Sequence, residues 1–429
     1  MVFKSFAKES LEYHMAQNDR DRNGKIGIEV TKRCNSEEDF SMAYLPGVVY
    51  PAMEIVKDAE RIYDYTNKGN FIAIISNGSS VLDLGSIGAQ AVKPILEGKA
   101  VLLKKLVNID AIDIEIDSND IDTIVTTITS IANSFGAINL DGFAAPLCFE
   151  IERRLKTKLN VPIFYDGIYV DAIITTAALL NYSEFSSKSI KEIKVVIIGR
   201  DLSAISSARL FKRFGIQHLY LFDEKGSINK HRSDLDNYLQ EFAINGTITL
   251  EDAIKDASVL YIAEDYGIEL SEKILRSMSD LPLIIGTAQP LPDILPDRIG
   301  DIRMDAIVVT NDRNSPNYID KLLVFPSILR ALLDVRATTI TEAMIMEAAK
   351  ALATLAREEI PPNVQRVFQD DDLSFGSEYL IPSIYDRRVM LYVATAIADR
   401  AVRDRVTQTK SFIKERYERY IQEISENIY

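Results

Sequence analysis

Residues 194–223 carry the pattern that most constrains the fold of this chain. Residues 195–198 are continuously apolar, as expected of a central parallel strand that is buried on both faces. Gly199 ends this run, apolar residues then recur at helical spacing, and Gly215 stands where a helix C-cap glycine belongs. A second strand is predicted at residues 219–222. This order of strand, turn, helix and strand is typical of a dinucleotide-binding βαβ unit.

The turn of this unit departs from the sequence that binds a dinucleotide. The expected pattern is G-x-G-x-x-G/A, whereas residues 199–204 read Gly-Arg-Asp-Leu-Ser-Ala. Asp201 replaces the glycine that lets the backbone approach the pyrophosphate, and its carboxylate adds bulk and a like charge. Gly199, Arg200 and Asp223 remain the candidate cofactor-binding residues, with Asp223 placed to hold a ribose. We therefore expect NAD to bind weakly or not at all.

Size and composition exclude several classes of protein. A length of 429 residues predicts two or three domains. The net charge of -14 argues against nucleic acid or an anionic membrane surface as the main partner. Cys34 and Cys148 are too few for a disulfide framework, and the chain shows neither a signal peptide nor an 18-residue apolar run. We expect a cytoplasmic protein.

The order of predicted elements indicates an α/β protein. Strands are expected at residues 71–75, 100–103, 194–198, 219–222, 259–263, 283–285 and 306–309. Helical or loop segments separate the later strands, which predicts a parallel sheet covered by helices. The chain becomes helical after about residue 336, and an apolar stripe at residues 413–428 is expected to pack on the body of the protein or on a second subunit.

Six colinear segments resemble the bacterial malic enzyme family. They are residues 42–51, 65–70, 93–102, 148–155, 333–338 and 381–386. The resemblance implies a malic-enzyme-like N-terminal substrate domain at 1–165, a Rossmann-type parallel-sheet domain that resembles NAD-binding domains at 166–385, and a C-terminal helical extension at 386–429. It also implies a homodimer.

The family chemistry implies roles for three residues. Malic enzymes oxidise malate by hydride transfer to NAD(P) and decarboxylate the product with the help of Mg²⁺ or Mn²⁺. A tyrosine and a lysine serve as general acid and general base, and Tyr44 and Lys99 match them. Asp166 matches the first aspartate of the family's His-Asp-Asp run, which lies near that lysine. Taken singly, each of the three would be read as structural, and only their common register makes them catalytic candidates.

The metal ligands of the family are not preserved. The family's Glu-Asp pair reads Asp141-Gly142, and the second aspartate of the His-Asp-Asp run is Gly167. Since glycine has no side chain to coordinate a cation, we expect no Mg²⁺ or Mn²⁺ site. Substrate positions also differ, with Gln289 in place of an asparagine, Asp320-Lys321 in place of two asparagines, and residues 168–171 in place of Gln-His-Gly-Thr.

Two hypotheses follow. In the first, the chain has lost metal- and NAD-dependent oxidative decarboxylation of malate, and no cofactor is expected. It is then either a regulatory or binding pseudoenzyme, alone or beside a true malic enzyme, or a non-redox acid/base catalyst that uses Tyr44 and Lys99 on a small oxo- or hydroxy-acid. The alternative is an active NAD-dependent malic enzyme that converts malate to pyruvate and CO2.

Overall fold

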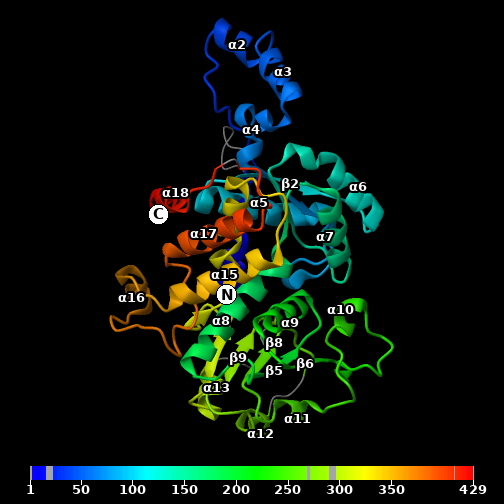
Figure 1. The fold of residues 1–429 in the computed structure, drawn as a ribbon, viewed down its shortest axis with the longest axis vertical. Coiled ribbons are helices and arrows are strands. Elements are labelled where there is room, and N and C mark those ends of the chain that lie inside the picture. The colour runs from blue at the N-terminus through cyan, green and yellow to red at the C-terminus, as the bar shows by residue number, and fades with distance from the viewer. Residues whose placement is uncertain (1, 16–22, 268–270, 289–295, 410, 429) are drawn as a thin grey trace. The chain divides into compact units, whose positions relative to one another are not determined.

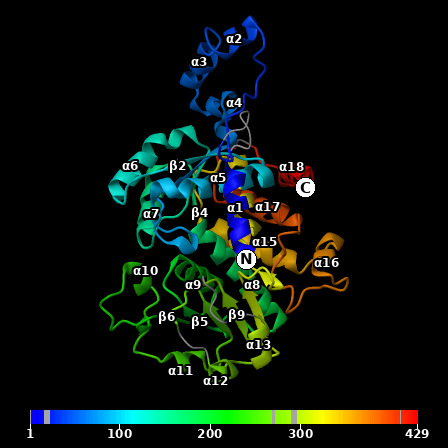
Figure 2. The same cartoon turned by 180° about the vertical axis from the view of Figure 1, so that it is seen from behind.

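The computed structural model describes residues 2–15, 23–267, 271–288, 296–409 and 411–428, which divide into two compact units (Figure 1, Figure 2). Unit 1 comprises Met1–Phe143 and Glu150–Ile163, and unit 2 comprises Ala144–Phe149 and Phe164–Tyr429. Each unit contains a parallel sheet accompanied by helices, which confirms the predicted α/β class.

The sheet of unit 1 has the strand order β2-β1-β3-β4. The strand predicted at residues 71–75 is confirmed as β1, which pairs in parallel with β2 on one side and with β3 on the other. The buried side chains of β1 form the centre of the core of this unit. The strands are β1 Phe71–Ser76, β2 Asp110–Glu115, β3 Ala137–Leu140 and β4 Ile163–Tyr165.

The strand predicted at residues 100–103 is wrong, because these residues lie inside the helix α5, Gly88–Val107. The buried residues of α5 are spaced three, four and seven apart, as on one face of a helix, and residues 100–103 are only its middle. The true edge strand β2 was missed because acidic residues interrupt its apolar pattern.

Two short helices of unit 1, α2 and α3, stand clear of its sheet in both views (Figure 1, Figure 2). Neither contains a buried residue. The helices of the first half of the chain are α1 Val2–His14, α2 Glu37–Ala43, α3 Val49–Lys57, α4 Ile62–Tyr65, α5, α6 Ile121–Ile131 and α7 Leu147–Lys158, with 3-10 turns at Ala59–Arg61, Asn67–Asn70, Leu82–Leu84 and Ala132–Ser134.

Unit 2 is built on a seven-stranded sheet in the order β11-β10-β9-β8-β5-β6-β7. The predicted strands are confirmed, and neighbouring strands are parallel except for the short hairpin of β6 and β7. The chain leaves β5 toward β6 and returns to β8 on the other side, so the carboxyl ends of β5 and β8 flank the topological switch point, where such sheets bind ligands. The strands are β5 Lys194–Ile198, β6 His218–Asp223, β7 Gly226–Ser227, β8 Val259–Ile262, β9 Leu283–Gly286, β10 Ile307–Thr310 and β11 Asn317–Tyr318.

Helices accompany this sheet, and the named elements from α14 onward are all helices (Figure 1). The predicted C-terminal stripe is confirmed as α18, which packs against α17 and buries Tyr417 and Ile421. The helices are α8 Asp166–Phe185, α9 Leu202–Phe214, α10 Asn237–Gln240, α11 Leu250–Ile254, α12 Glu272–Arg276, α13 Pro296–Ile302, α14 Phe325–Asp334, α15 Glu342–Ala356, α16 Pro362–Phe368, α17 Arg388–Arg403 and α18 Lys414–Ile428, with a 3-10 turn at Lys321–Leu323. Among the described residues, no helix combines the length and apolarity needed to cross a bilayer.

Candidate active site

The candidate acid Tyr44 lies in a tight turn at the end of α2. Its backbone N–H donates to the carbonyl oxygen of Phe40 at 2.9 Å and closes the helix. The turn requires glycine at position 47, because a Cβ atom there would lie 2.2 Å from the carbonyl oxygen of Met42. The backbone of Tyr44 is thus well fixed, while its side chain is 70% exposed.

The candidate base Lys99 lies on α5 and forms an ion pair with Asp141, which follows β3. Lys99 Nζ and Asp141 Oδ2 are 2.5 Å apart, and the Lys99 side chain is only 13% exposed. Asp141 is therefore already engaged by a cation of its own unit. A lysine must be without its proton before it can act as a general base.

The backbone at Gly142 does not suit a metal-binding side chain. Its φ is +63°, in the left-handed region, and a Cβ atom there would lie 2.8 Å from Ser76 Oγ. Gly167 lies on α8, where a Cβ atom would be 3.2 Å from Leu202 Cδ1, a contact with a flexible side chain. In the part of the chain that the structure describes, no group of three His, Cys, Asp or Glu side chains is placed to hold a metal ion. The residues present therefore do not fit the divalent metal of the family chemistry.

Asp166 is the first residue of α8 in unit 2. It follows β4 directly and is 5% exposed. An acid in the first turn of a helix interacts favourably with the helix dipole, which accounts for a structural role. The catalytic role that the family resemblance implies for Asp166 stays a prediction.

The turn after β5 adopts the backbone expected of a dinucleotide-binding turn. Gly199 has a φ of +145°, and a Cβ atom there would lie 2.9 Å from the Cβ of Ala263, so only glycine fits. Asp201 is the N-cap of α9, and its Oδ1 accepts the Ala204 N–H at 2.8 Å. The side chain of Asp201 therefore accepts an N–H group at the N-terminus of α9, where a phosphate would be expected to bind.

The charge on Asp201 differs from the expectation. Burial, together with the nearby carboxylate of Glu264, raises the pKa of Asp201 to about 8. At neutral pH the protonated form is thus favoured, and the expected repulsion by a full like charge is weakened. The structural effect of Asp201 on the turn is therefore that its side chain caps the N-terminus of α9.

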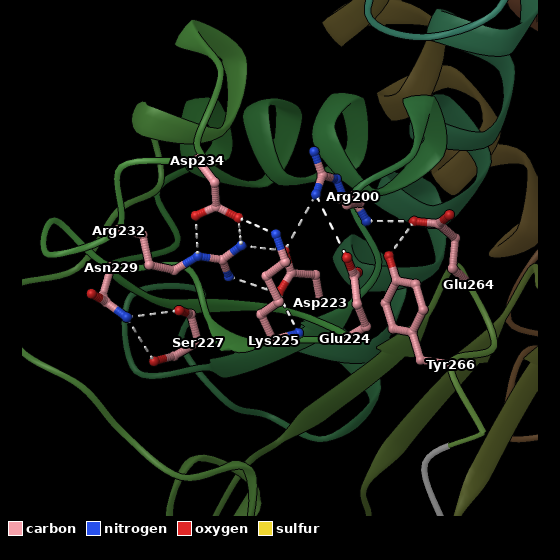
Figure 3. A network of polar contacts seen from close by, with 10 residues as sticks. All are labelled: Arg200, Asp223, Glu224, Lys225, Ser227, Asn229, Arg232, Asp234, Glu264 and Tyr266. Carbon is pink, nitrogen blue, oxygen red and sulfur yellow. Dashed lines mark hydrogen bonds and ion pairs between the residues drawn. The ribbon is translucent and has the colours of Figure 1, made fainter.

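Sequence reasoning missed Glu264, which lies 64 positions from the turn. Glu264 Oε2 accepts the backbone N–H of Arg200 at 2.6 Å and the hydroxyl of Tyr266 at 2.6 Å (Figure 3). The available signal was its place directly after β8, at the carboxyl edge of the sheet, where ligand-binding residues gather.

Asp223 ends β6, as predicted, but its carboxylate is held by other side chains of unit 2 (Figure 3). Arg232 donates to both Asp223 oxygens at 2.7 Å, and the backbone N–H of Lys225 donates at 3.0 Å. Although burial opposes its charged form, the hydrogen bonds from Arg232 hold the pKa of Asp223 below its usual value. Since a carboxylate accepts about four hydrogen bonds, little capacity remains for a ribose hydroxyl.

The charges around Asp223 leave no net positive potential for a 2′-phosphate. Arg200 Nη1 lies 3.6 Å from Asp223, and Arg232 also contacts Asp234 at 2.9 Å. The network in Figure 3 contains three cationic side chains and four carboxylates: Arg200, Lys225, Arg232, Asp223, Glu224, Asp234 and Glu264. The arginines are therefore neutralised within the protein.

The remaining altered positions act within unit 2. Asp320 caps the 3-10 turn Lys321–Leu323 by accepting the Leu322 N–H at 2.8 Å. Asp171 and Lys321 act in opposite directions on the pKa of Asp201, the first raising it and the second lowering it. Gln289 lies outside the described residues.

The fold and these positions define an α/β protein with a Rossmann-type domain whose dinucleotide turn has been altered. Residues 22–156 match the family described as malic enzyme, N-terminal domain. The NADP-dependent malic enzyme of Halomonas elongata is 39% identical over 396 residues, which cover 92% of this chain and 93% of that protein. The probable NADP-dependent malic enzyme of Rickettsia prowazekii is 38% identical over 96% of this chain, which spans only 54% of its length.

A crystal structure of malic enzyme from Pyrococcus horikoshii has the same fold. Its TM-score is 0.86 at 31% identity, with 98% of this chain and 96% of that chain covered. The chain belongs to the malic enzyme family. It spans nearly the whole of some relatives and about half the length of others.

Proposed function

We propose that this chain is a malic enzyme relative that has lost metal- and nucleotide-dependent oxidative decarboxylation of malate. The observation that carries the proposal is Gly142, because its left-handed backbone would place an added Cβ atom 2.8 Å from Ser76 Oγ and so does not suit a carboxylate ligand. Without a divalent cation, the enolate formed on decarboxylation loses several kcal/mol of stabilisation, which corresponds to orders of magnitude in rate.

The second candidate function is an active NAD(P)-dependent malic enzyme. Its support is that relatives 38–39% identical over more than nine-tenths of this chain are called NADP-dependent malic enzymes. Tyr44 and Lys99 are also retained. The site geometry favours the first proposal, because both the metal positions and the phosphate turn differ from what the reaction requires.

One set of assays separates these candidates. With malate, Mn²⁺ and NAD⁺ or NADP⁺, the protein is expected to form NAD(P)H no faster than a protein-free mixture. The Halomonas relative, assayed in parallel, serves as the positive control. Calorimetric titration with Mn²⁺ in the presence of oxalate should show no tight site. Malate-dependent NAD(P)H formation, or tight Mn²⁺ binding, would establish the active enzyme instead.

The same protein, assayed in EDTA, distinguishes the two forms of the first proposal. A non-redox catalyst on a small oxo-acid should exchange the methyl protons of pyruvate with D2O, as followed by NMR. That exchange should disappear in Tyr44→Phe and Lys99→Ala and persist in Lys105→Ala, which removes an exposed lysine of the same helix. No exchange above background by the wild type, across several oxo-acids, supports a regulatory or binding pseudoenzyme.

We also propose that a second copy of this chain covers the α2–α3 apolar face. Helices without buried residues are marginal on their own, and an apolar patch of this kind marks an interface. Its exposed members are Phe40, Met42, Tyr44, Leu45, Val48, Val49, Tyr50, Met53 and Val56.

Sedimentation equilibrium tests the proposed homodimer. The wild type should be dimeric, and Val56→Glu should weaken association at least about tenfold, because it places a charge on the face. Met304→Glu, at a residue 95% exposed outside this face, is the matched control and should remain dimeric. A monomeric wild type contradicts the proposal.

We place the protein in the cytoplasm as part of the same proposal. Cys34 and Cys148 are both free, in keeping with a reducing compartment. The net charge of -14 argues against nucleic acid or an anionic membrane surface as a partner.

A further inference from the structure

A carboxylate of the segment after β8 contacts the backbone of the phosphate turn (Figure 3). Glu264 Oε2 accepts from the Arg200 N–H and from the Tyr266 hydroxyl, both at 2.6 Å. Burial and the hydrogen bond to Glu264 raise the pKa of Tyr266 well above its usual value, so that its hydroxyl stays a donor. Tyr266 thus fixes the Glu264 carboxylate against the turn.

A second carboxyl group closes the other end of the turn. Asp201 Oδ1 accepts the Ala204 N–H at 2.8 Å, in the first turn of α9. In a dinucleotide-binding fold, the N–H groups of this turn and of the helix N-terminus face the pyrophosphate. Here two of those donors, one on each side of Asp201, already have acceptors within the chain.

The turn and the segment after β8 are also packed closely against each other. A Cβ atom on Gly199 would lie 2.9 Å from the Cβ of Ala263 and 3.3 Å from the backbone nitrogen of Glu264. The Ala263 and Glu264 N–H groups both donate to the carbonyl oxygen of Ile198, at 2.8 and 3.2 Å. The backbone of Glu264 is therefore fixed next to the Arg200 N–H, which the Glu264 side chain accepts.

We propose that Glu264 and Asp201 are built-in occupants of the phosphate turn, so that the nucleotide site of unit 2 is closed by an autoinhibitory contact. The two carboxyl groups stand where the oxygens of a pyrophosphate would accept the same N–H groups. A nucleotide must displace both and leave the Tyr266 hydroxyl without its acceptor. This inference rests on the proposed loss of nucleotide-dependent chemistry and gives it a structural cause.

The test measures binding rather than turnover. Inorganic pyrophosphate and NADP⁺ are titrated calorimetrically, in EDTA and at low salt, into the wild type and the Glu264→Ala/Asp201→Gly variant. The wild type should show no binding in the micromolar range, and the variant should bind both probes at least about tenfold more tightly, because two donors become free. Glu224→Ala removes a carboxylate of the same network that does not contact these donors, and it should show no gain.

The Glu264→Gln variant distinguishes two causes of a closed site, the side-chain oxygen that accepts the Arg200 N–H and the negative charge of Glu264. It removes the charge but keeps an oxygen that accepts the Arg200 N–H, so it should remain closed to both probes. A gain equal to that of the Glu264→Ala/Asp201→Gly variant shows that the charge of Glu264 alone is the obstacle and overturns the proposal. Tight binding by the wild type also overturns it, as does a folded double variant that gains nothing.

Two further readouts cover the remaining outcomes. If the double variant does not fold, the test is amide hydrogen exchange at the Arg200 N–H in the wild type and in Tyr266→Phe. The exchange rate should be several-fold higher in Tyr266→Phe, because that variant lacks the hydroxyl that donates to Glu264. An unchanged rate overturns the proposal. NAD(P)H formation from malate by the wild type would contradict the proposed function itself. If neither the wild type nor the double variant binds the two probes, only the autoinhibitory contact is contradicted.

Discussion

The Gly142→Asp variant is expected to unfold with a free energy about 2–3 kcal/mol below that of the wild type. Its backbone has a φ of +63°, and the new Cβ atom would lie 2.8 Å from Ser76 Oγ and 3.3 Å from Val81. The Ser76 hydroxyl accepts the Gly78 N–H at 3.0 Å, so it cannot move aside freely. Urea denaturation followed by circular dichroism measures the loss.

Two other glycines serve as matched controls for this variant. Gly85 has a similar φ of +67° but nothing within 4 Å of its Cβ position, so Gly85→Asp isolates the backbone term, about 1 kcal/mol. Gly167→Asp meets the movable end of Leu202 and should cost less than about 1 kcal/mol. If Gly142→Asp proves as stable as Gly85→Asp, the steric argument against a ligand at position 142 fails.

The Asp334→Ala variant is expected to lose about 3–5 kcal/mol of stability, because it leaves a buried arginine without its carboxylate. Arg330 Nη2 lies 2.6 Å from Asp334 Oδ1, and the two side chains are 5% and 11% exposed. The Tyr417 hydroxyl on α18 donates to Asp334 Oδ2 at 2.9 Å, so this carboxylate also holds the last helix. Chemical denaturation measures the loss, and Tyr417→Phe should cost only about 1 kcal/mol.

The control for Asp334 is an exposed pair of the same spacing. Arg276 and Glu272 are 55% and 62% exposed and lie 2.7 Å apart, so Glu272→Ala should change stability by less than about 1 kcal/mol. Replacing both buried partners, as in Arg330→Met with Asp334→Leu, should recover most of the loss. An Asp334→Ala variant as stable as Glu272→Ala would show that the buried pair is not required.

The elements that were predictable from sequence are those with a strong period and clear boundaries. The apolar run before Gly199 and the glycine cap at Gly215 placed β5 and α9, and both are confirmed. Residues 100–103 were misassigned because four apolar residues fit a strand and a buried helix equally well. Strand β2 was missed because its acidic residues hide the apolar pattern.

The chemical groups that are missing from the site can be read from the amino-acid sequence without a structure. Glycine at 142 and at 167 removes two carboxylates whatever the fold, and the residues of the altered turn can be read directly from positions 199–204. The retained Tyr44 and Lys99 were found in the same way.

The contacts that replace the missing groups depend on how the chain folds. Glu264 contacts Arg200 across 64 positions because both follow parallel strands, whose carboxyl ends lie at one edge of the sheet. Asp141, which follows β3, contacts Lys99 on the helix α5 across 42 positions. The protonation of Asp201 depends on its burial beside Glu264, which no local pattern contains. Such contacts depend on the packing of distant segments, so the sequence shows that the turn is altered, while the fold shows which side chains of unit 2 contact it.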